Sequence, residues 1–229
     1  VLYFQIRQSQ GSFEKFHGAV IDHYGGNDTR VFREVSELGN KLQMLDEIAG
    51  TCTSAKAAII FDWENRWAME HAAGPRNKNL YYKETVEKSY TALKRYGIDV
   101  DVIDMEQALD GYKIVLVPML YLFRCGIEDK LKKFTQAGGV IVVTYWSGIV
   151  NDTDQCFLGG TPHGLMDVLG LRSEEIDSLY DGEFNTAVPI EGNVLGINTQ
   201  YICTNLCDLV RLSSAEAIMV YDNDFYRGK

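Results

Sequence analysis

The sequence predicts an α/β domain built on a parallel sheet over most of its length, and three observations support this. Short apolar runs alternate with amphipathic stretches from residue 57 onward, which is the spacing of β-α-β units. The first of these runs, residues 57–61, is continuously apolar, as in a strand covered on both faces. Glycines mark the ends of the amphipathic stretches. Right-handed crossovers then predict a doubly wound sheet of the flavodoxin-like or glutamine-amidotransferase-like kind.

Two elements precede this domain. The apolar residues 1–4 predict a short buried strand. A long amphipathic helix is expected between the polar residues 27–29 and Gly50, since its apolar residues recur at alternating steps of four and three. These residues are Val31, Val35, Leu38, Leu42 and Leu45. The helix could also pack on a domain of its own, and a new domain is expected to begin near Lys56.

The first strand and helix of the α/β domain follow. Residues 57–61 predict the strand, and a polar loop rich in aromatic residues is expected over 62–79. Asn79 is expected to cap the next helix, which ends at Gly97. The residues on the apolar face of this helix are Tyr82, Val86, Tyr90 and Leu93.

The remaining strands of the sheet are expected at residues 100–103, 114–118, 140–143 and 215–221. A helix bearing Ile127, Leu131 and Phe134 joins the third strand to the fourth and ends at the glycines 138 and 139. Residues 144–214 are rich in Gly, Asp and Asn, which predicts long loops with an extra β ribbon.

Composition excludes several classes of function. The chain has 229 residues with 22 basic and 32 acidic side chains, and its net charge of −10 opposes binding to nucleic acid or an anionic membrane. We expect no membrane span and no export signal, and therefore a cytoplasmic protein. Five cysteines without a C-x-x-C pair predict reduced structural thiols and no metal site.

The run FQIRQSQGSFEKFHGAV, residues 4–20, places Arg7, Glu14 and His17 on a loop after the expected first strand. This run resembles the end of the catalytic barrel in the β-galactosidases of glycoside hydrolase family 42, and the resemblance continues along the chain. It implies that residues 1–50 form the last βα unit of a (β/α)8 barrel, whose loops carry the active site. It also implies that residues 51–229 form the α/β domain through which subunits make trimers.

The resemblance further implies an activity. The parent enzyme would hydrolyse terminal β-D-galactosides with retention and without a cofactor. Both catalytic glutamates of the family would lie upstream of residue 1, so this chain would contain no catalytic residue. We therefore expect an inactive fragment that stops before a small C-terminal β domain.

Glu14 and His17 are the main substrate-binding candidates. In the family, the Glu and His of the E-K-F-H element bind the galactosyl hydroxyls, and both match here. A carboxylate and an imidazole three residues apart can hold adjacent hydroxyls through charge-assisted hydrogen bonds. Arg7 is a third candidate, with a structural role as its alternative. Ile6 departs from the Trp of several family members, so an aromatic contact from this position is not expected.

A second candidate region directly follows the first strand of the α/β domain, where open parallel sheets have their ligand crevice. Tryptophans flanked by acids can stack on a sugar, and the resemblance implies that this segment faces the barrel mouth. The alternative is packing at a domain or subunit interface, where Trp and Arg are enriched. The candidates are Trp63, Glu64, Arg66 and Trp67.

Two other classes of function remain open. A stand-alone α/β binding or assembly module would have no enzymatic role. A divergent amidotransferase-like hydrolase would need a nucleophilic cysteine on the turn after the third strand, but that turn is Pro118-Met119-Leu120-Tyr121, and Cys125 lies later. A nucleotide or flavin site would need a phosphate-binding loop after the first strand, where this chain has bulky acidic residues. The expected partners are a galactoside and two further copies of the chain.

Overall fold

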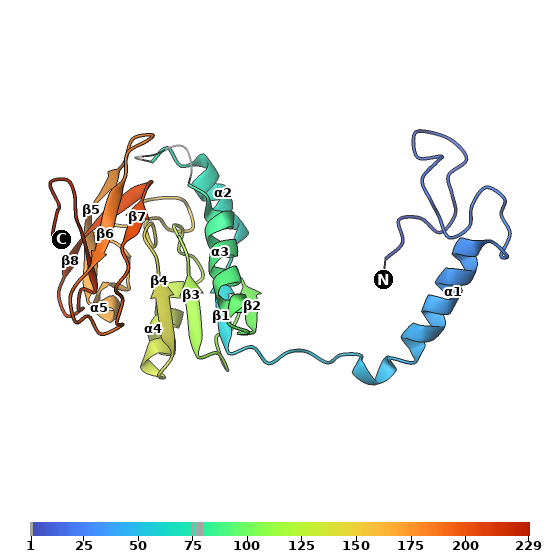
Figure 1. Cartoon of the computed structure of the whole chain (residues 1–229), viewed down its shortest axis with the longest axis horizontal. Coiled ribbons are helices and arrows are strands. Elements are labelled where there is room, and N and C mark those ends of the chain that lie inside the picture. The colour runs from blue at the N-terminus through green and yellow to red at the C-terminus, as the bar shows by residue number, and fades with distance from the viewer. Residues whose placement is uncertain (1, 75, 77–79) are drawn as a thin grey trace. The chain divides into compact units, whose positions relative to one another are not determined.

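The computed structural model describes residues 2–74, 76 and 80–229. The chain forms two compact units, Val1–Thr53 and Ser54–Lys229 (Figure 1). The first unit contains the helix α1 (Arg30–Gln43) and a short 3₁₀ helix, Asp46–Ile48. The second contains the parallel sheet, its helices and a region of antiparallel strands.

The expected long helix is confirmed as α1. It begins after Thr29, whose hydroxyl accepts a hydrogen bond from the Phe32 amide at 3.3 Å, as an N-cap does. The helix ends before Leu45, earlier than expected. None of its residues is buried, so its apolar stripe is open to solvent within this chain.

The buried strand expected at residues 1–4 is wrong for the described residues 2–4. Leu2 is 99% exposed and Phe4 is 71% exposed. Over residues 2–29 the only β-type backbone pairing described is a single bridge between Arg7 and Ile21. A strand needs neighbours that satisfy its backbone and cover its side chains, and residues 2–29 supply only this one bridge.

The second unit confirms the α/β prediction. Its described residues include a four-stranded sheet in the order β2-β1-β3-β4, with every pair parallel. The strands are β1 (Ala57–Ile60), β2 (Val100–Ile103), β3 (Ile114–Val117) and β4 (Val140–Val143). All four match predicted strands. Coverage on both faces holds for β1, but on β4 Val140 and Val142 are exposed, so one face there is open.

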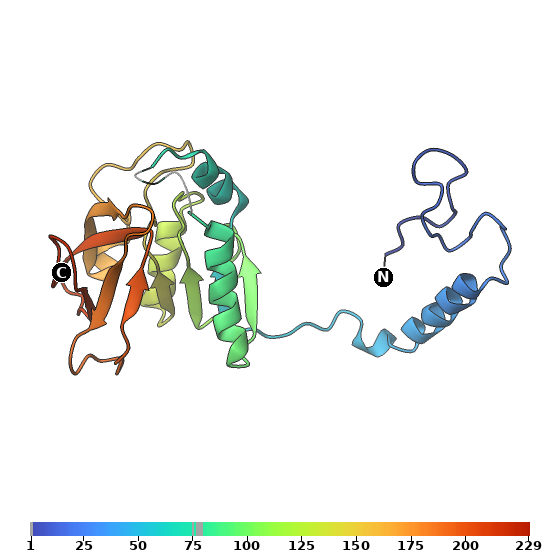
Figure 2. The same ribbon diagram turned by 45° about the horizontal axis from the view of Figure 1, so that its top comes forward.

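Three helices accompany the sheet. They are α2 (Trp63–His71), α3 (Tyr82–Arg95) and α4 (Ile127–Gln136). The helices α3 and α4 were predicted, and they lie on opposite faces of the sheet (Figures 1 and 2), as right-handed crossovers in opposite directions require.

The loop expected over 62–79 is wrong in its first half, because α2 begins directly after β1. The carboxylate of Asp62 accepts a hydrogen bond from the Asn65 amide at 3.1 Å and so caps the helix. Asp62 was not predicted as a cap, and the cap that was predicted for the next helix, Asn79, lies outside the described residues.

Antiparallel strands fill the region after β4. They are β5 (Leu171–Ser178), β6 (Asn185–Pro189), β7 (Tyr201–Cys203), β8 (Leu206–Leu212) and β9 (Met219–Tyr221), with the short helix α5 (Met166–Leu169) before them. β5 and β8 form the expected ribbon, and β7-β6-β9 form a further sheet. The prediction that 215–221 would join the parallel sheet is wrong, because β9 pairs antiparallel with β6, with Ala187 opposite Tyr221 and Pro189 opposite Met219.

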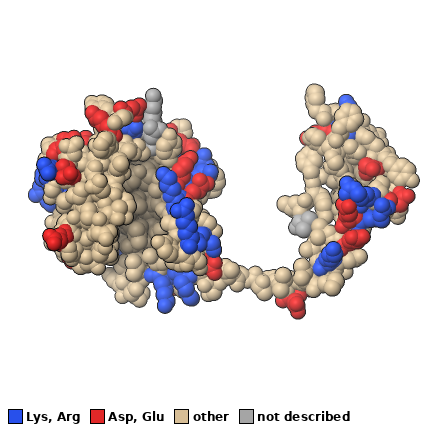
Figure 3. Space-filling model, in the orientation of Figure 1, with Lys and Arg blue, Asp and Glu red and all other residues tan. Residues whose placement is uncertain are grey.

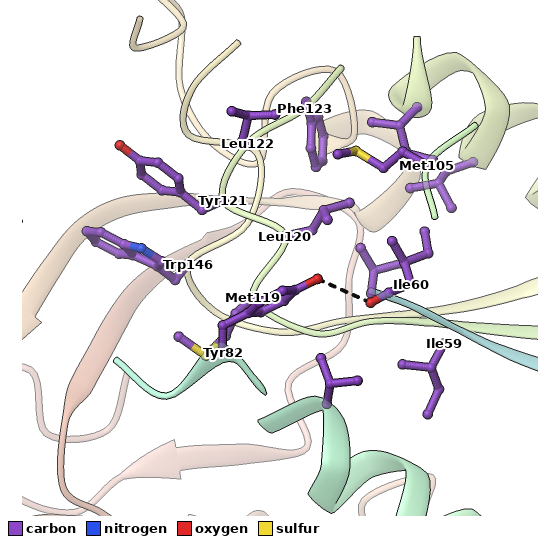
Figure 4. Packing of buried hydrophobic residues seen from close by; sticks show 14 of the residues in the cluster. Ile59, Ile60, Tyr82, Met105, Met119, Leu120, Tyr121, Leu122, Phe123 and Trp146 are labelled. Atoms are coloured by element: carbon purple, nitrogen blue, oxygen red, sulfur yellow. Dashed lines mark hydrogen bonds between the residues drawn. The ribbon is translucent and has the colours of Figure 1, made fainter. Parts of the chain in front are cut away.

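The main core lies around β1 and β3 (Figure 4). Tyr82 of α3 is inserted at the end of β1, where its hydroxyl accepts from the Asp62 amide at 3.0 Å and donates to the Ile60 carbonyl at 3.4 Å. A smaller cluster under the antiparallel strands contains Leu179, Cys207, Leu209 and Tyr226. No helix in the described part of the chain has the length and apolar character to cross a bilayer.

Candidate functional site

The first unit brings Glu14 and His17 together on one turn. The amide of His17 donates to the Glu14 carbonyl at 3.0 Å, and both side chains are exposed. The Phe4 ring packs edge-on against His17 with the ring centres 5.6 Å apart, and the Gln5 amide donates to the His17 carbonyl at 3.2 Å. Two polar side chains on one turn can hold neighbouring hydroxyls of one ligand.

Arg7 belongs to a different group of residues. Together with Asp22 and His23 it lines a polar pocket of about 210 Å³ in the same unit. His23 is held by its Nε2 atom, 2.8 Å from the Ser9 carbonyl. His23 was not predicted, since a single histidine outside any recognised element gave no reason to select it.

At the carboxyl edge of the parallel sheet, the ligand crevice contains an ion-pair network. Arg124, which follows β3, donates to the fully buried Asp62 at 2.6 Å, and its guanidinium also lies 3.2 Å from Glu64. A third carboxylate, Glu106, accepts from it at 2.8 Å. Although burial lowers the pKa of Arg124, the hydrogen bonds to Asp62 and Glu106 raise it overall. One guanidinium therefore pairs with three carboxylates, and at this edge of the sheet the charged side chains are engaged with one another.

The turn after β3 has a strained backbone, as the turn that carries the catalytic cysteine of an amidotransferase does, but it contains no cysteine. Met119 has a φ of +44°, rare for a residue with a side chain, and is fully buried. Asn65 braces it by donating to the Met119 carbonyl at 3.1 Å and accepting from the Leu122 amide at 2.8 Å. Cys125 lies beyond this turn, beside Arg124. These positions do not support an amidotransferase-like hydrolase.

The structure separates the four candidates of α2. Trp63 and Trp67 lie one turn apart with ring centres 6.2 Å apart and are 52% and 53% exposed. The Arg66 guanidinium lies 5.2 Å from the centre of the Trp63 ring. Glu64 instead reaches the network around Arg124. Trp63 lines a groove together with Phe61, Arg66, Val86, Tyr90 and Val102.

The histidine, cysteine and acidic side chains form no metal cluster among the described residues, and the thiols are unbridged. Among the described residues no group of three or more His, Cys, Asp or Glu side chains could hold a metal ion. All five cysteines are free. The hydrogen bond between the Cys203 and Cys207 thiols lowers the pKa of Cys203 to about 7 and raises the pKa of Cys207.

Comparison with known proteins defines the class. Residues 55–229 match the family described as "Beta-galactosidase trimerisation domain", and residues 1–45 match the family described as "Beta-galactosidase". Both descriptions name one class of enzyme, the β-galactosidases. The chain belongs to the trimerisation-domain family of glycoside hydrolase family 42, which confirms the resemblance seen in the sequence.

Individual relatives agree. The chain is 53% identical to β-galactosidase BglY of Alicyclobacillus acidocaldarius and 47% identical to β-galactosidase Pbg of Clostridium perfringens, covering 100% of this chain and 33% of each relative. Among solved structures, the cold-adapted β-galactosidase from Rahnella sp. R3 is 54% identical with a TM-score of 0.83, covering 99% of this chain and 33% of that one. The β-galactosidase from Bacillus circulans sp. alkalophilus is 43% identical with a TM-score of 0.84, covering 98% and 33%. The chain thus spans about a third of the length of the curated relatives it matches.

Proposed function

We propose that this chain is part of a retaining β-galactosidase that hydrolyses terminal β-D-galactosides without a cofactor. The observation that carries the proposal is the order of two matches along one chain, the β-galactosidase family over residues 1–45 and its trimerisation domain over 55–229. A retaining glycosidase needs two carboxyl groups roughly 5 to 5.5 Å apart at the sugar. We assign both to the part of the enzyme upstream of this chain.

The two parts of the chain have different roles in this proposal. In the longer enzyme, residues 1–50 complete the last βα unit of the catalytic barrel, whose strand forms against neighbouring strands, and there Glu14 and His17 bind galactosyl hydroxyls and Arg7 assists. The shared turn of Glu14 and His17 and their exposure support this role. Hydrogen bonds from charged groups to the sugar strengthen as the transition state develops charge, so these contacts favour catalysis as well as binding.

Residues 51–229 provide assembly in a homotrimer. The family description supports self-association, and a ring of three closes through head-to-tail contacts between two different patches of each copy. The strand order β2-β1-β3-β4 supports a flavodoxin-like or amidotransferase-like sheet that has kept the fold without that chemistry. A cytoplasmic location completes the proposal and rests on the sequence.

The experiment is a chromogenic assay on two proteins, this chain alone and the longer protein that extends it upstream. The longer protein is expected to cleave a β-galactoside and leave the matching α-galactoside intact, while this chain alone is inactive. Turnover by the purified chain, free of host β-galactosidase, would place the catalytic groups within it and refute the assignment. A folded but inactive longer protein would favour the stand-alone assembly module.

A further inference from the structure

An exposed aromatic surface lies on one side of the second unit. Its exposed members are Trp63, Trp67, Tyr90 and Val102, from α2, α3 and β2, and the partly buried Phe61 at the end of β1 lies against them. Phe61 packs edge-on against Trp63 at 5.2 Å and stacks on the buried Tyr82 at 5.4 Å, which fixes the surface to the core. Phe61 and Trp63 are therefore held in place before any partner arrives.

The size of this aromatic surface suits the centre of a protein interface. A fully buried aromatic side chain contributes about 150–250 Å², so two half-exposed tryptophans with Tyr90 and Val102 offer roughly 400 Å². This is about half of the roughly 800 Å² that each partner contributes to a standard interface. Trp, Tyr and Arg are also the residue types that dominate binding energy at such centres.

The charges at the rim are already paired. Arg66 pairs with Glu70 at 2.8 Å, and Lys83 pairs with Glu87 at 2.9 Å. Basic and acidic side chains lie interspersed along α3 (Figure 3). Copies of a chain with a net charge of −10 repel one another, so a locally neutral surface is a favourable place for them to meet.

The same contacts weigh against a sugar platform. Stacking on a pyranose requires a free aromatic face, but the guanidinium of Arg66 already lies over the Trp63 ring and Phe61 packs against it. A protein partner can use the exposed ring edges together with the aliphatic part of Arg66. The packing around Trp63 therefore favours a protein partner.

We propose that the aromatic surface is one of the two patches through which a copy of this chain binds the next copy. The inference rests on the proposed homotrimer and names its contact residues. In a head-to-tail ring the surface meets a different region of the neighbour, so each Trp63 and Trp67 is buried once per contact.

The test compares the 229-residue chain with its Trp63→Ala/Trp67→Ala variant by sedimentation over a concentration series. Tyr180→Ala removes another exposed aromatic ring and is the matched control. Circular dichroism checks folding, which half-exposed residues should not disturb. We expect the double variant to raise the apparent dissociation constant at least tenfold and the control to leave it unchanged.

Hydroxyl-radical footprinting provides an independent readout on the unaltered chain. Trp63 and Trp67 should become protected as concentration rises, whereas the exposed Met44 should not. The assignment of the aromatic surface is refuted if the double variant still associates, or if Met44 is protected instead of the tryptophans. Either result leaves the trimer proposal intact. A chain that stays monomeric at every concentration overturns self-association itself, and the surface with it, without touching the proposed activity.

Discussion

Replacing Arg124 by methionine should destabilise the second unit strongly. The substitution keeps an unbranched apolar stem but removes the cation that lies 2.6 Å from Asp62, 2.8 Å from Glu106 and 3.2 Å from Glu64. Asp62 is fully buried, and its described hydrogen bonds to the Arg124 guanidinium would be lost. Breaking a buried ion pair from one side costs about 3–5 kcal/mol, because the remaining charge loses its ionic partner.

Thermal unfolding measures this loss. For a chain of 150–250 residues, 1 kcal/mol lowers the Tm by about 2–4 °C, so Arg124→Met should lower it by roughly 6 °C or more. Arg66→Met is the matched control, because it breaks the partly exposed pair with Glu70, for which about 0–1 kcal/mol is expected.

A double-mutant cycle with Asp62→Asn isolates the pair. The asparagine can still cap α2, and it carries no charge that requires Arg124. The two substitutions together should therefore cost less than the sum of their separate effects. A Tm for Arg124→Met within 1 °C of the unaltered chain, or purely additive effects, would refute the structural role of this network.

Two further predictions concern Glu14, His17 and Asp208. In the longer enzyme, Glu14→Ala and His17→Ala should each lower kcat/KM by about two to three powers of ten. Each substitution removes a hydroxyl contact worth about 2–4 kcal/mol in the transition state. Near-normal steady-state kinetics would show that neither residue contributes to substrate binding. Burial raises the pKa of Asp208 from 3.8 to about 6, so the native state holds this proton more tightly and stability falls as the pH rises from about 4 to 6. Asp208→Asn should therefore raise the free energy of unfolding by up to about 3 kcal/mol above pH 6, and with it the Tm. Below pH 4 the substitution should change the Tm little. Melting curves across this range test the sign, with the exposed Asp152→Asn as control; a benefit that appears only in acid contradicts it.

Local patterns predicted those elements whose burial is decided locally. Three of the four parallel strands are continuous apolar runs and β2 is interrupted only by Asp101, while α3 and α4 each carry one apolar face that ends at glycines. The helix α2 escaped prediction because residues 63–71 mix aromatic and charged side chains without an apolar stripe, and its clearest marker was the capping carboxylate of Asp62. The strand expected at residues 1–4 depended on neighbours that local sequence does not describe.

The candidate sites also differ in how far the local sequence could predict them. Glu14 and His17 were selected by resemblance, and their spacing alone predicts only that they can share a turn, as they do. The network of Asp62, Glu106 and Arg124 joins residues that follow three different strands, so only the strand order brings them together. Sequence spacing gave no reason to connect them.

The most direct test of the account is the stereochemistry of the longer enzyme on a β-galactoside, followed by proton NMR of the anomeric signals. A retaining family 42 enzyme must release β-galactose first, with the α anomer appearing only later by mutarotation. We predict this order for the unaltered protein, and the same order at a much lower rate for His17→Ala. Release of α-galactose first, or absence of turnover by a folded and assembled protein, would contradict the assignment of this chain to a retaining β-galactosidase.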